Sequence, residues 1–283
     1  MDGFVFVDKP KGLTSQDVCL RLKRKFNSKC GHNGTLDPNT TGVLVVAVGK
    51  ACKLLKLINE HDKKYQAKIV FGYDSTTLDV DGEITQNIDM SINLDELKNA
   101  LSTLALRDEQ IPPMTSAIKV NGRKLYEYQR KGIEVEVKPR KTKIHSYKLL
   151  SDLKMVDGHY EIDILLDVAK GFYVRSFARD LGNLLGGCAI LKELRRTKAG
   201  EFNINECKML DKITEDDVKS IKDVFNFKSV EVDDYIAKLV KNGVVLDQRQ
   251  TNLNEVFFVT NNCDIIAIYE PVGENKYKPI IIF

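Results

Sequence analysis

The sequence predicts an α+β protein: a mixed core of helices and strands followed by a small, β-rich second domain. Three observations predict this. Apolar strand patterns alternate with helical spacing through roughly the first 200 residues, short strands separated by turn signals fill the end of the chain, and no internal repeat or low-complexity linker interrupts either part. With 283 residues, 43% hydrophobic and 29% charged, the chain is long enough for one large core or two unequal ones.

The first half of the chain predicts alternating strands and helices, each justified by its apolar spacing. In chain order we expect a strand over 4–7, a helix capped by Thr14 or Ser15 with Val18, Leu22 and Phe26 on one face, a strand over 43–48, a helix over 50–58 with Cys52, Leu55 and Ile58 inward, a strand over 65–71, a helix over 94–104 capped by Asn93, and a short strand over 116–120. Together they predict a mixed core whose loops carry the polar residues of interest.

The second half predicts two long strands, two helices and a β-rich tail. We expect strands over 144–150 and 160–168, a helix over 172–185, and a helix over 214–224 whose start is marked by Thr214 and the acids that follow it. From about Tyr235 the pattern changes to short strands over 240–246, 256–259, 265–269 and 279–283, with turn signals at 242–243, 261–262 and 273. The basic segment that ends near Lys143 is typical of an excursion from the core.

One acid, Asp37, stands in a glycine-punctuated loop directly ahead of the apolar strand over 43–48. The glycines of this stretch permit backbone conformations and close approaches that other residues resist, and Pro38 restricts the turn after the acid. Such a loop can present Asp37 to a ligand. The same pattern is typical of a tight surface turn with a solvated Asp, and the local sequence does not choose between the two.

The net charge of +3 conceals a strong asymmetry along the chain. Residues 1–200 carry 33 Lys and Arg against 25 Asp and Glu, whereas residues 201–283 carry 10 against 15. The first part holds two basic clusters: five bases over 18–36 with no acid among them, and nine bases against three acids over 119–143, where two tyrosines are interleaved. Such clusters are typical of proteins that bind a nucleic-acid backbone, although a solvated charged face is the usual alternative.

Composition and spacing also exclude several classes of protein. No apolar run reaches membrane-spanning length, and the chain begins with an apolar strand rather than a targeting peptide, so we expect a cytoplasmic protein. The six cysteines are scattered without a Cys-x-x-Cys pair or a His at ligand spacing, so we interpret them as reduced thiols and expect no metal site. The spacing over 42–50 does not fit a P-loop, and that over 79–82 does not fit a calcium loop, which leaves a turn or a substrate-side loop there.

Several motifs, in order, resemble those of the TruB family of tRNA pseudouridine synthases. They are VDKPKGLTS over 7–15, GHNGTLDP over 31–38 followed by TGVL over 41–44, KKYQA over 63–67, PPMTSAIKVNG over 112–122, LYE over 125–127, GFYVRS over 171–176 and LRR over 194–196. The resemblance covers roughly residues 3–200. Motifs this numerous in one order leave little room for coincidence.

The resemblance implies a reaction and roles for individual residues. A pseudouridine synthase breaks the C–N glycosidic bond of a uridine, turns the uracil and rejoins it to the sugar through carbon, with no cofactor. Asp37 is implied to be the nucleophilic carboxylate, which attacks the sugar carbon or, in a variant mechanism, stabilises charge while the sugar loses a proton. Arg175 is implied to pair with that carboxylate, and Tyr65 to stack on the flipped uracil and help move a proton.

Four further residues are implied to bind the RNA or support the site. His32 resembles the residue that fills the gap left by the flipped uridine, Tyr173 and Leu194 resemble residues that line the uracil pocket, and Lys9 resembles a support beneath the active loop. Taken alone, His32 is a common loop residue, Leu194 a core leucine and Lys9 a strand-end lysine.

Three positions depart from the family pattern. Asn33 stands where the family usually has Thr, Thr115 where a Tyr usually precedes Ser-Ala, and Ile190 where many relatives have His. We expect the first two to alter RNA contacts without touching the nucleophile. The excess of acids in the tail also weakens the expectation that the tail binds phosphate.

The resemblance thus implies a two-domain enzyme. Its catalytic domain, 1–230, is expected to have a mixed, largely antiparallel central sheet with flanking helices and an RNA-gripping insertion near 112–143, and 231–283 to form a small β-rich, PUA-like domain. The implied activity is isomerisation of the T-loop uridine of tRNA, position 55 in tRNA numbering, by a monomer that needs no cofactor, metal or protein partner. The alternative from another class is a non-catalytic RNA-binding protein that assists tRNA folding; the presence of Asp37, Tyr65 and Arg175 argues against it.

Overall fold

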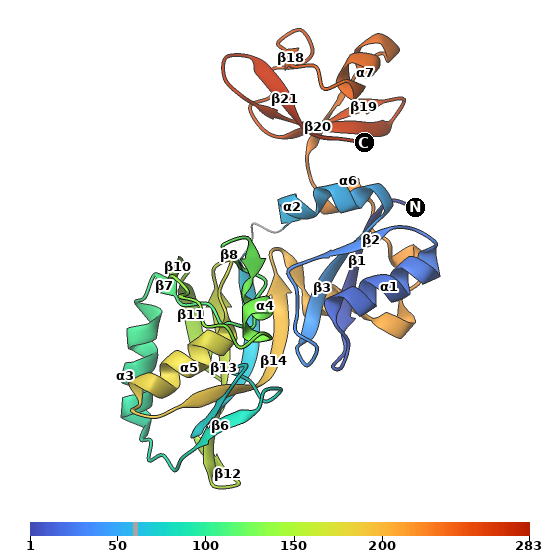
Figure 1. The fold of residues 1–283 in the computed structure, drawn as a ribbon. Coiled ribbons are helices and arrows are strands. Elements are labelled where there is room, and N and C mark those ends of the chain that lie inside the picture. The colour runs from blue at the N-terminus through green and yellow to red at the C-terminus, as the bar shows by residue number, and fades with distance from the viewer. Residues whose placement is uncertain (59–61) are drawn as a thin grey trace.

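A large sheet runs through the middle of the molecule (Figure 1). The structure, a computed structural model, describes residues 1–58 and 62–283. The strands of this sheet are β1 Gly3–Lys9, β2 Cys30–Asn33, β3 Thr41–Val48, β4 Lys63–Phe71, β11 Ile144–Leu149, β12 Lys154–Val156, β13 His159–Val168, β14 Ala189–Ala199, β15 Phe202–Asn203 and β16 Lys208–Met209. In the described residues the order is β11-β13-β4-β14-β3-β1-β16, with β12, β15 and β2 paired at its sides.

The pairings of this sheet confirm the expected α+β class with a largely antiparallel sheet. Within the described ranges, the parallel pairs are β14 with β3 and β1 with β16, and the other pairs of the sheet are antiparallel. Both parallel pairs are only two residues long.

Short helices and hairpins connect the strands. The α-helices are α1 Ser15–Phe26, α2 Leu55–Ile58, α3 Leu94–Ala105, α4 Leu125–Gln129, α5 Val174–Leu184, α6 Ile221–Val224 and α7 Asp234–Lys241, and the 3-10 helices are η1 Gly49–Leu54, η2 Ile204–Glu206, η3 Leu210–Lys212 and η4 Glu215–Asp217. Three small two-stranded pairs are β5 Tyr73–Ser75 with β6 Ile84–Asn87, β7 Glu109–Gln110 with β10 Arg140–Lys141, and β8 Lys119–Val120 with β9 Arg123–Lys124. Within the described ranges, no helix has the length and apolar character that crossing a membrane requires.

Strands β1 and β3 are buried on both faces, which explains their uninterrupted apolar runs. On one face, their residues pack with α1; these are Val5, Val7, Leu44, Val46 and Val48. On the other face they pack with η1, α2 and the C-terminal sheet; these are Phe4, Phe6, Val43, Val45 and Ala47. The helix α1 begins as expected, because the Thr14 side chain accepts from the Asp17 N–H.

The other half of the sheet is covered on one face only. Alternate residues of β4 and β13 pack against α3 and α5 in one apolar cluster. The opposite face carries charged pairs between the same two strands, Lys64 with Asp167 at 2.9 Å and Lys68 with Asp163 at 3.4 Å. This alternation follows from one-sided burial, and it is what made both strands predictable.

Strand β14 joins the two halves, and the sequence did not predict it. It pairs with β4 along its length and touches β3 at Arg195↔Thr41 and Arg196↔Gly42. Its pattern is broken by basic and acidic residues at 192, 193, 195, 196 and 198, since only its first part is in the apolar core. This strand has polar residues on its exposed face and a buried, hydrogen-bonded arginine. It therefore lacks the apolar alternation by which a strand is recognised in a sequence.

A second sheet forms the C-terminal part of the chain, as expected (Figure 1). Its strands are β17 Lys228–Glu231, β18 Leu246–Asp247, β19 Phe257–Asn261, β20 Asp264–Pro271 and β21 Lys276–Ile282, in the order β17-β19-β20-β21-β18. Helix α7 packs on one face of this sheet, and the other face packs on η1, α2 and α6.

Two predicted helices were wrong in type or extent. Residues 50–58 form mostly the 3-10 helix η1, in which three residues per turn place i and i+3 on one face. Ala51, Leu54 and Ile58 are buried, whereas Cys52 and Leu55 are half-buried against the same apolar cluster. The helix over 214–224 is divided into η4 and α6, because the backbone of Lys219 between them exchanges two 2.8 Å hydrogen bonds with Phe4.

Two predicted strands were also wrong. Residues 240–245 do not form a strand; α7 runs to Lys241, because Asp233 caps it by accepting from the Ile236 N–H, and only Leu246–Asp247 is extended and paired. The strand over 116–120 is reduced to Lys119–Val120, because Thr115 and Ser116 turn towards the arginine of α5 and the cavity beside it.

Candidate active site

The loop over 34–38 presents Asp37 between two anchored neighbours. Leu36 is 4% exposed; its N–H donates to Ser15 Oγ (2.9 Å), which donates to the Leu36 carbonyl (3.1 Å). The Pro38 carbonyl accepts from the Gly12 N–H (2.9 Å) and from Lys9 Nζ (3.0 Å). The backbone is therefore held on both sides of Asp37, whose side chain remains 44% exposed.

Lys9 lies beneath this loop, fully buried at the end of β1. Its ammonium donates to the carbonyls of Pro10 (3.0 Å), Leu13 (2.6 Å) and Pro38 (3.0 Å), which uses its three donors. Burial lowers the pKa of Lys9 to about 8, against the opposing effect of Asp37. This position agrees with the expected support beneath the active loop.

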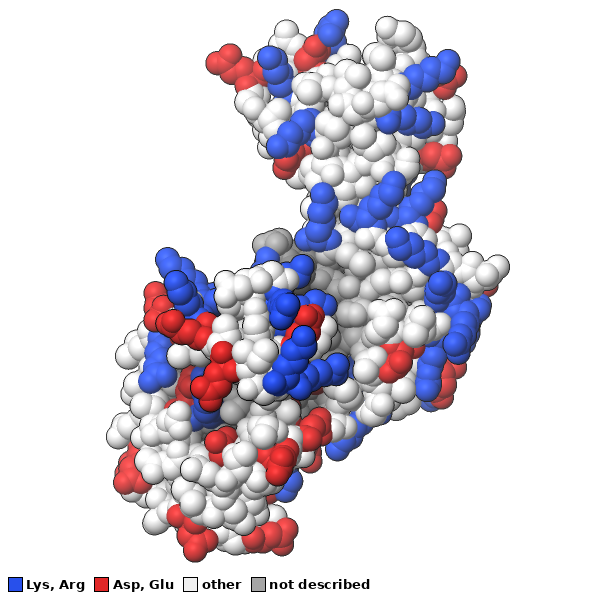
Figure 2. Space-filling model, viewed as in Figure 1, with Lys and Arg blue, Asp and Glu red and all other residues white. Residues whose placement is uncertain are grey.

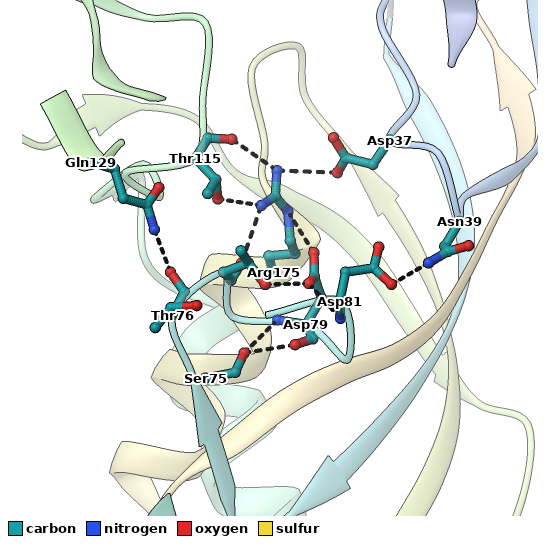
Figure 3. A network of polar contacts seen from close by, with 10 residues as sticks. Asp37, Asn39, Ser75, Thr76, Asp79, Asp81, Thr115, Gln129 and Arg175 are labelled. Carbon is teal, nitrogen blue, oxygen red and sulfur yellow. Dashed lines mark hydrogen bonds and ion pairs between the residues drawn. The ribbon is translucent and has the colours of Figure 1, made fainter. Parts of the chain in front are cut away.

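Arg175, near the start of α5, is 7% exposed and pairs with the acid: Nη2 lies 3.0 Å from Asp37 Oδ2 (Figure 3). The same guanidinium donates from Nη1 to the Thr77 carbonyl (3.1 Å) and to the Thr115 hydroxyl, and from Nη2 to the Thr115 carbonyl (3.1 Å). Its Nε lies 3.6 Å from Asp79 Oδ2. A guanidinium whose two terminal nitrogens are both hydrogen-bonded can hold the Asp37 carboxylate in one orientation.

The loop between β5 and β6 forms the floor of this network (Figure 3). Ser75 Oγ donates to the Asp79 carbonyl (2.6 Å) and accepts from the Asp79 N–H (3.1 Å), which closes the loop. Burial raises the pKa of Asp79, while the Thr77 hydroxyl and Arg175 act in the opposite direction. Asn39, two residues after the proposed nucleophile, donates to Asp81 in the same loop. Residues 79–82, for which the sequence left a turn or a substrate-side loop, lie in this loop and approach Arg175 through Asp79.

A cavity of about 390 Å³ brings most of the predicted residues together. Asp37, Tyr65, Tyr173, Arg175 and Leu194 line it, although they come from four distant parts of the chain. Two larger cavities, of about 510 and 570 Å³, do not contain Asp37. We place the site at the smaller cavity, because the acid–arginine pair rather than volume carries the chemistry.

Two polar features shape this cavity further. The side chain of Gln110 holds Tyr173 by its backbone, donating to the Tyr173 carbonyl (3.0 Å) and accepting from its N–H (2.9 Å). Burial raises the pKa of the Tyr173 hydroxyl. Ser116 also lines the cavity and is 5% exposed, and its side chain interacts with the Tyr173 hydroxyl, which opposes this rise in pKa.

His32 lies outside the cavity. It belongs to β2 and faces Val46 of β3, so the first residues of the expected loop over 31–38 are a strand instead. Its side chain is half-buried, Nδ1 has no hydrogen-bond partner within the described chain, and burial lowers its pKa. The structure therefore places His32 on the strand that leads into the Asp37 loop, not beside the acid.

Sequence reasoning missed four residues that build the site. Asp79, Thr115 and Gln110 reach Arg175 or Tyr173 from loops far away in the chain. Arg196, 1% exposed, donates to the carbonyls of Gly34 and Val43, each at 2.8 Å, and so ties β14 to the Asp37 loop. Thr115, one of the departures from the family pattern, contacts Arg175 through both its hydroxyl and its carbonyl.

The basic segment near 112–143 stands beside the site. Its hairpin β8–β9 turns at Asn121 and Gly122. Lys124 and Arg130, which flank α4, each lie 5.4 Å from the ring centre of Tyr126 within it. Figure 2 shows Lys and Arg gathered beside the hollow next to α4, along the α1 side and where the C-terminal sheet meets the large sheet, while acids dominate the end near β12. On this face of the molecule, therefore, basic side chains gather beside the hollow, while acidic ones gather at the end near β12 (Figure 2).

Comparison with known proteins identifies close relatives along the whole chain. The family described as TruB family pseudouridylate synthase (N terminal domain) matches residues 22–174. The tRNA pseudouridine synthase B of Acholeplasma laidlawii (strain PG-8A) is 39% identical over 286 residues, and that of Aster yellows witches'-broom phytoplasma (strain AYWB) is 37% identical over 289 residues. Both alignments cover 100% of this chain and 100% of the relative.

Solved structures share the fold at low sequence identity. A Cbf5-Nop10-Gar1 complex contains a chain with a TM-score of 0.69 and 21% identity, covering 99% of this chain and 84% of its own. An H/ACA RNP bound to a substrate RNA containing 2'-deoxyuridine contains one with a TM-score of 0.65 and 20% identity, covering 96% of this chain and 78% of its own. At this identity the likeness concerns the fold, both sheets included.

Proposed function

Because this chain belongs to the TruB family of pseudouridylate synthases and is a tRNA pseudouridine synthase, we propose that Asp37 is its nucleophile and Arg175 the cation that orients it. The observation that carries the proposal is the 3.0 Å Asp37–Arg175 pair in the wall of a cavity that two tyrosines also line. Relatives named tRNA pseudouridine synthase B align with this chain over its full length, and this does not favour a protein that only assists tRNA folding.

The reaction needs a flipped uridine and one carboxylate. The uridine must leave its stack to reach the cavity, at a cost on the order of a few kcal/mol. In the covalent route an Asp37 oxygen bonds to C1′ of the sugar while the N1–C1′ bond breaks and uracil leaves with the electron pair. The uracil turns and C5 forms a bond to C1′ as the Asp37 oxygen leaves. C5 then loses its proton and N1 gains one, so the product is an isomer of the substrate. In the variant route Asp37 stabilises charge while the sugar loses a proton.

The remaining cavity residues bind the base in this proposal. Tyr65 is 7% exposed on β4 and stacks on the uracil, while Tyr173 and Leu194 line the pocket around it. Lys9 holds the loop from below, and His32 fills the gap left in the RNA. The insertion near 112–143 supplies exposed lysines and arginines that bind the RNA phosphates.

We extend the proposal to the substrate position and to the organisation of the chain. The uridine is that of the tRNA T loop, position 55, and the enzyme acts as a monomer in the cytoplasm, with every cavity residue supplied by one chain. The catalytic domain ends near residue 230, where β17 begins the second sheet.

The test maps pseudouridine to the nucleotide in an unmodified tRNA transcript, with wild type beside Asp37→Asn. Wild type should give product at the T-loop uridine, whereas Asp37→Asn should give none and bind tRNA within about threefold of wild type, because only the nucleophilic charge is removed. Asp152→Asn, at an exposed acid in the turn after β11, is the matched control and should remain active.

Other outcomes discriminate between the hypotheses. Full turnover by Asp37→Asn would refute its role as nucleophile. Tight binding without product from either protein would favour the RNA-folding alternative, and product at another uridine would keep the chemistry and discard the T loop as target.

A further inference from the structure

We propose that Thr115 is a positioning residue for the reaction: its hydroxyl and carbonyl fix the Arg175 guanidinium and so link the basic insertion to the Asp37 carboxylate. This inference rests on the proposed roles of Asp37 and Arg175. Thr115 stands where the family pattern has Tyr, so the contact is a feature of this chain's own sequence.

The geometry of Arg175 assigns this role. Nη1 donates to the Thr77 carbonyl and the Thr115 hydroxyl, and Nη2 donates to the Thr115 carbonyl while it pairs with Asp37. Thr115 therefore supplies two of the four close acceptors around the terminal nitrogens. The Nε contact with Asp79, at 3.6 Å, is longer than a hydrogen bond and cannot replace them.

Removal of the hydroxyl would leave a buried N–H of Arg175 without its acceptor. Arg175 is 7% exposed, so water replaces a lost partner poorly, and the planar group can turn about its remaining contacts. Because the same plane carries the nitrogen that faces Asp37 Oδ2, such a turn changes the orientation of the carboxylate. A small displacement of a reacting group lowers the rate constant of the reaction strongly but changes the affinity for the substrate little.

The insertion is tied to this arginine at two points. Thr115 lies at its beginning, and Gln129 of α4 donates to the Thr76 carbonyl at 2.6 Å, next to the residue whose carbonyl accepts from Arg175 (Figure 3). An RNA that moves α4 therefore moves both acceptor segments of Arg175. Contact between the insertion and RNA is in this way transmitted to the Asp37–Arg175 pair.

The experiment compares three variants under single-turnover conditions with an unmodified tRNA transcript. Thr115→Val keeps the shape and removes the hydroxyl; Thr115→Ser keeps the hydroxyl. Thr260→Val is the matched control, because Thr260 is a buried threonine of the second sheet whose hydroxyl donates to the Glu231 carboxylate rather than touching Arg175. The measurements are the rate constant at saturating enzyme, the tRNA Kd and the melting temperature.

We expect Thr115→Val to lower the rate constant about tenfold with the tRNA Kd within about twofold of wild type. Thr115→Ser should recover most of the rate, and Thr260→Val should match wild type. A wild-type rate for Thr115→Val would overturn the inference, as would a Thr115→Ser variant equally slow, or a Kd that rises as much as the rate falls. Asp37→Asn runs in parallel: if it is inactive while Thr115→Val is normal, only this inference fails, and if it is active the proposed site fails.

Discussion

Lys9 places a buried ammonium directly under the Asp37 loop. Because this group titrates, its effect on the free energy of unfolding can be measured as a function of pH. Burial lowers the pKa of Lys9 from 10.5 to about 8. An unfolded chain keeps this proton up to about pH 10.5, whereas the folded protein releases it near pH 8, so between these values the unfolded state binds more protons and stability rises with pH. Below pH 8 both states are protonated, and the full cost of burying the charge is present.

We therefore predict that wild type gains about 2 kcal/mol of unfolding free energy relative to Lys9→Met between pH 8 and pH 10, from about 1.4 kcal/mol per pKa unit. Urea unfolding of both proteins at the two pH values measures the difference. Lys11→Met, at an exposed lysine of the same turn, should show no such gain. A difference that is flat or reversed in pH would mean that Lys9 keeps its proton, held by its three carbonyls.

Site residues that belong to a recognisable motif were predictable from the sequence. Residues that reach the site only through tertiary contacts were not. Asp37, Tyr65 and Arg175 belong to recognisable motifs, and the structure brings them to one cavity. Asp79 and Thr115 contact Arg175 across about 60 to 100 positions of chain, and no local pattern encodes such a pairing. A clue existed in the loop at 75–82, where three hydroxyl residues are followed by two acids and a glycine, a composition typical of a loop closed by its own side chains.

At the level of elements, the site depends on the short junction between β3 and β14. Gly42 has a φ of +104°, and a Cβ there would lie 2.1 Å from the Arg196 carbonyl oxygen of β14. Both strands carry parts of the site: β3 follows the Asp37 loop and β14 carries Leu194 and Arg196. Only a residue without a side chain permits the two backbones to approach this closely.

We predict that Gly42→Ala lowers the free energy of unfolding by about 2–5 kcal/mol, because the added methyl group meets backbone that cannot move aside and the residue is strained at positive φ. Gly158→Ala tests the strain alone, since Gly158 has a φ of +85° and a Cβ there would meet nothing within 4 Å, and should cost about 1–2 kcal/mol. Urea unfolding of the two variants gives both values. Equal losses would show that the close approach to β14 contributes nothing.

Elements were predicted correctly where burial imposed one period and missed where a distant strand decided the backbone. Strand β4 and helix α3 have one buried face each, and their bounds agree with the sequence within two residues. The break in the helix over 214–224 depends on a pairing of Lys219 with Phe4 at the opposite end of the chain. The prediction of one continuous helix failed because this tertiary pairing overrides the local helix propensity.

In the molecule as a whole, the two sheets share an apolar cluster. Four aromatic rings run from β1 to the second sheet: Phe4 to Phe225 at 5.8 Å, Phe225 to Phe227 at 5.3 Å, and Phe227 to Phe258 at 5.3 Å between ring centres. Lys53 donates to the Ile282 carbonyl at 2.7 Å across the same contact. The sequence indicated a second domain but not this continuity, because nothing in a local pattern shows which strand faces meet.

This shared cluster predicts that the two parts unfold together, and Phe227 is the ring that joins them. Phe227→Ala should remove about 1–3 kcal/mol of coupling, less than a fully buried phenylalanine would, and should resolve calorimetric unfolding into two transitions. Tyr235→Ala, at a residue of α7 that is 70% exposed, is the control within the second sheet's domain and should unfold as wild type does.

Since the cavity lies wholly in the large sheet's half, Phe227→Ala should keep the wild-type single-turnover rate at 25 °C once tRNA binding is saturated. A single transition at the wild-type temperature would show that the contact contributes little, whereas a slower rate at saturation would show that the second sheet acts on the site itself.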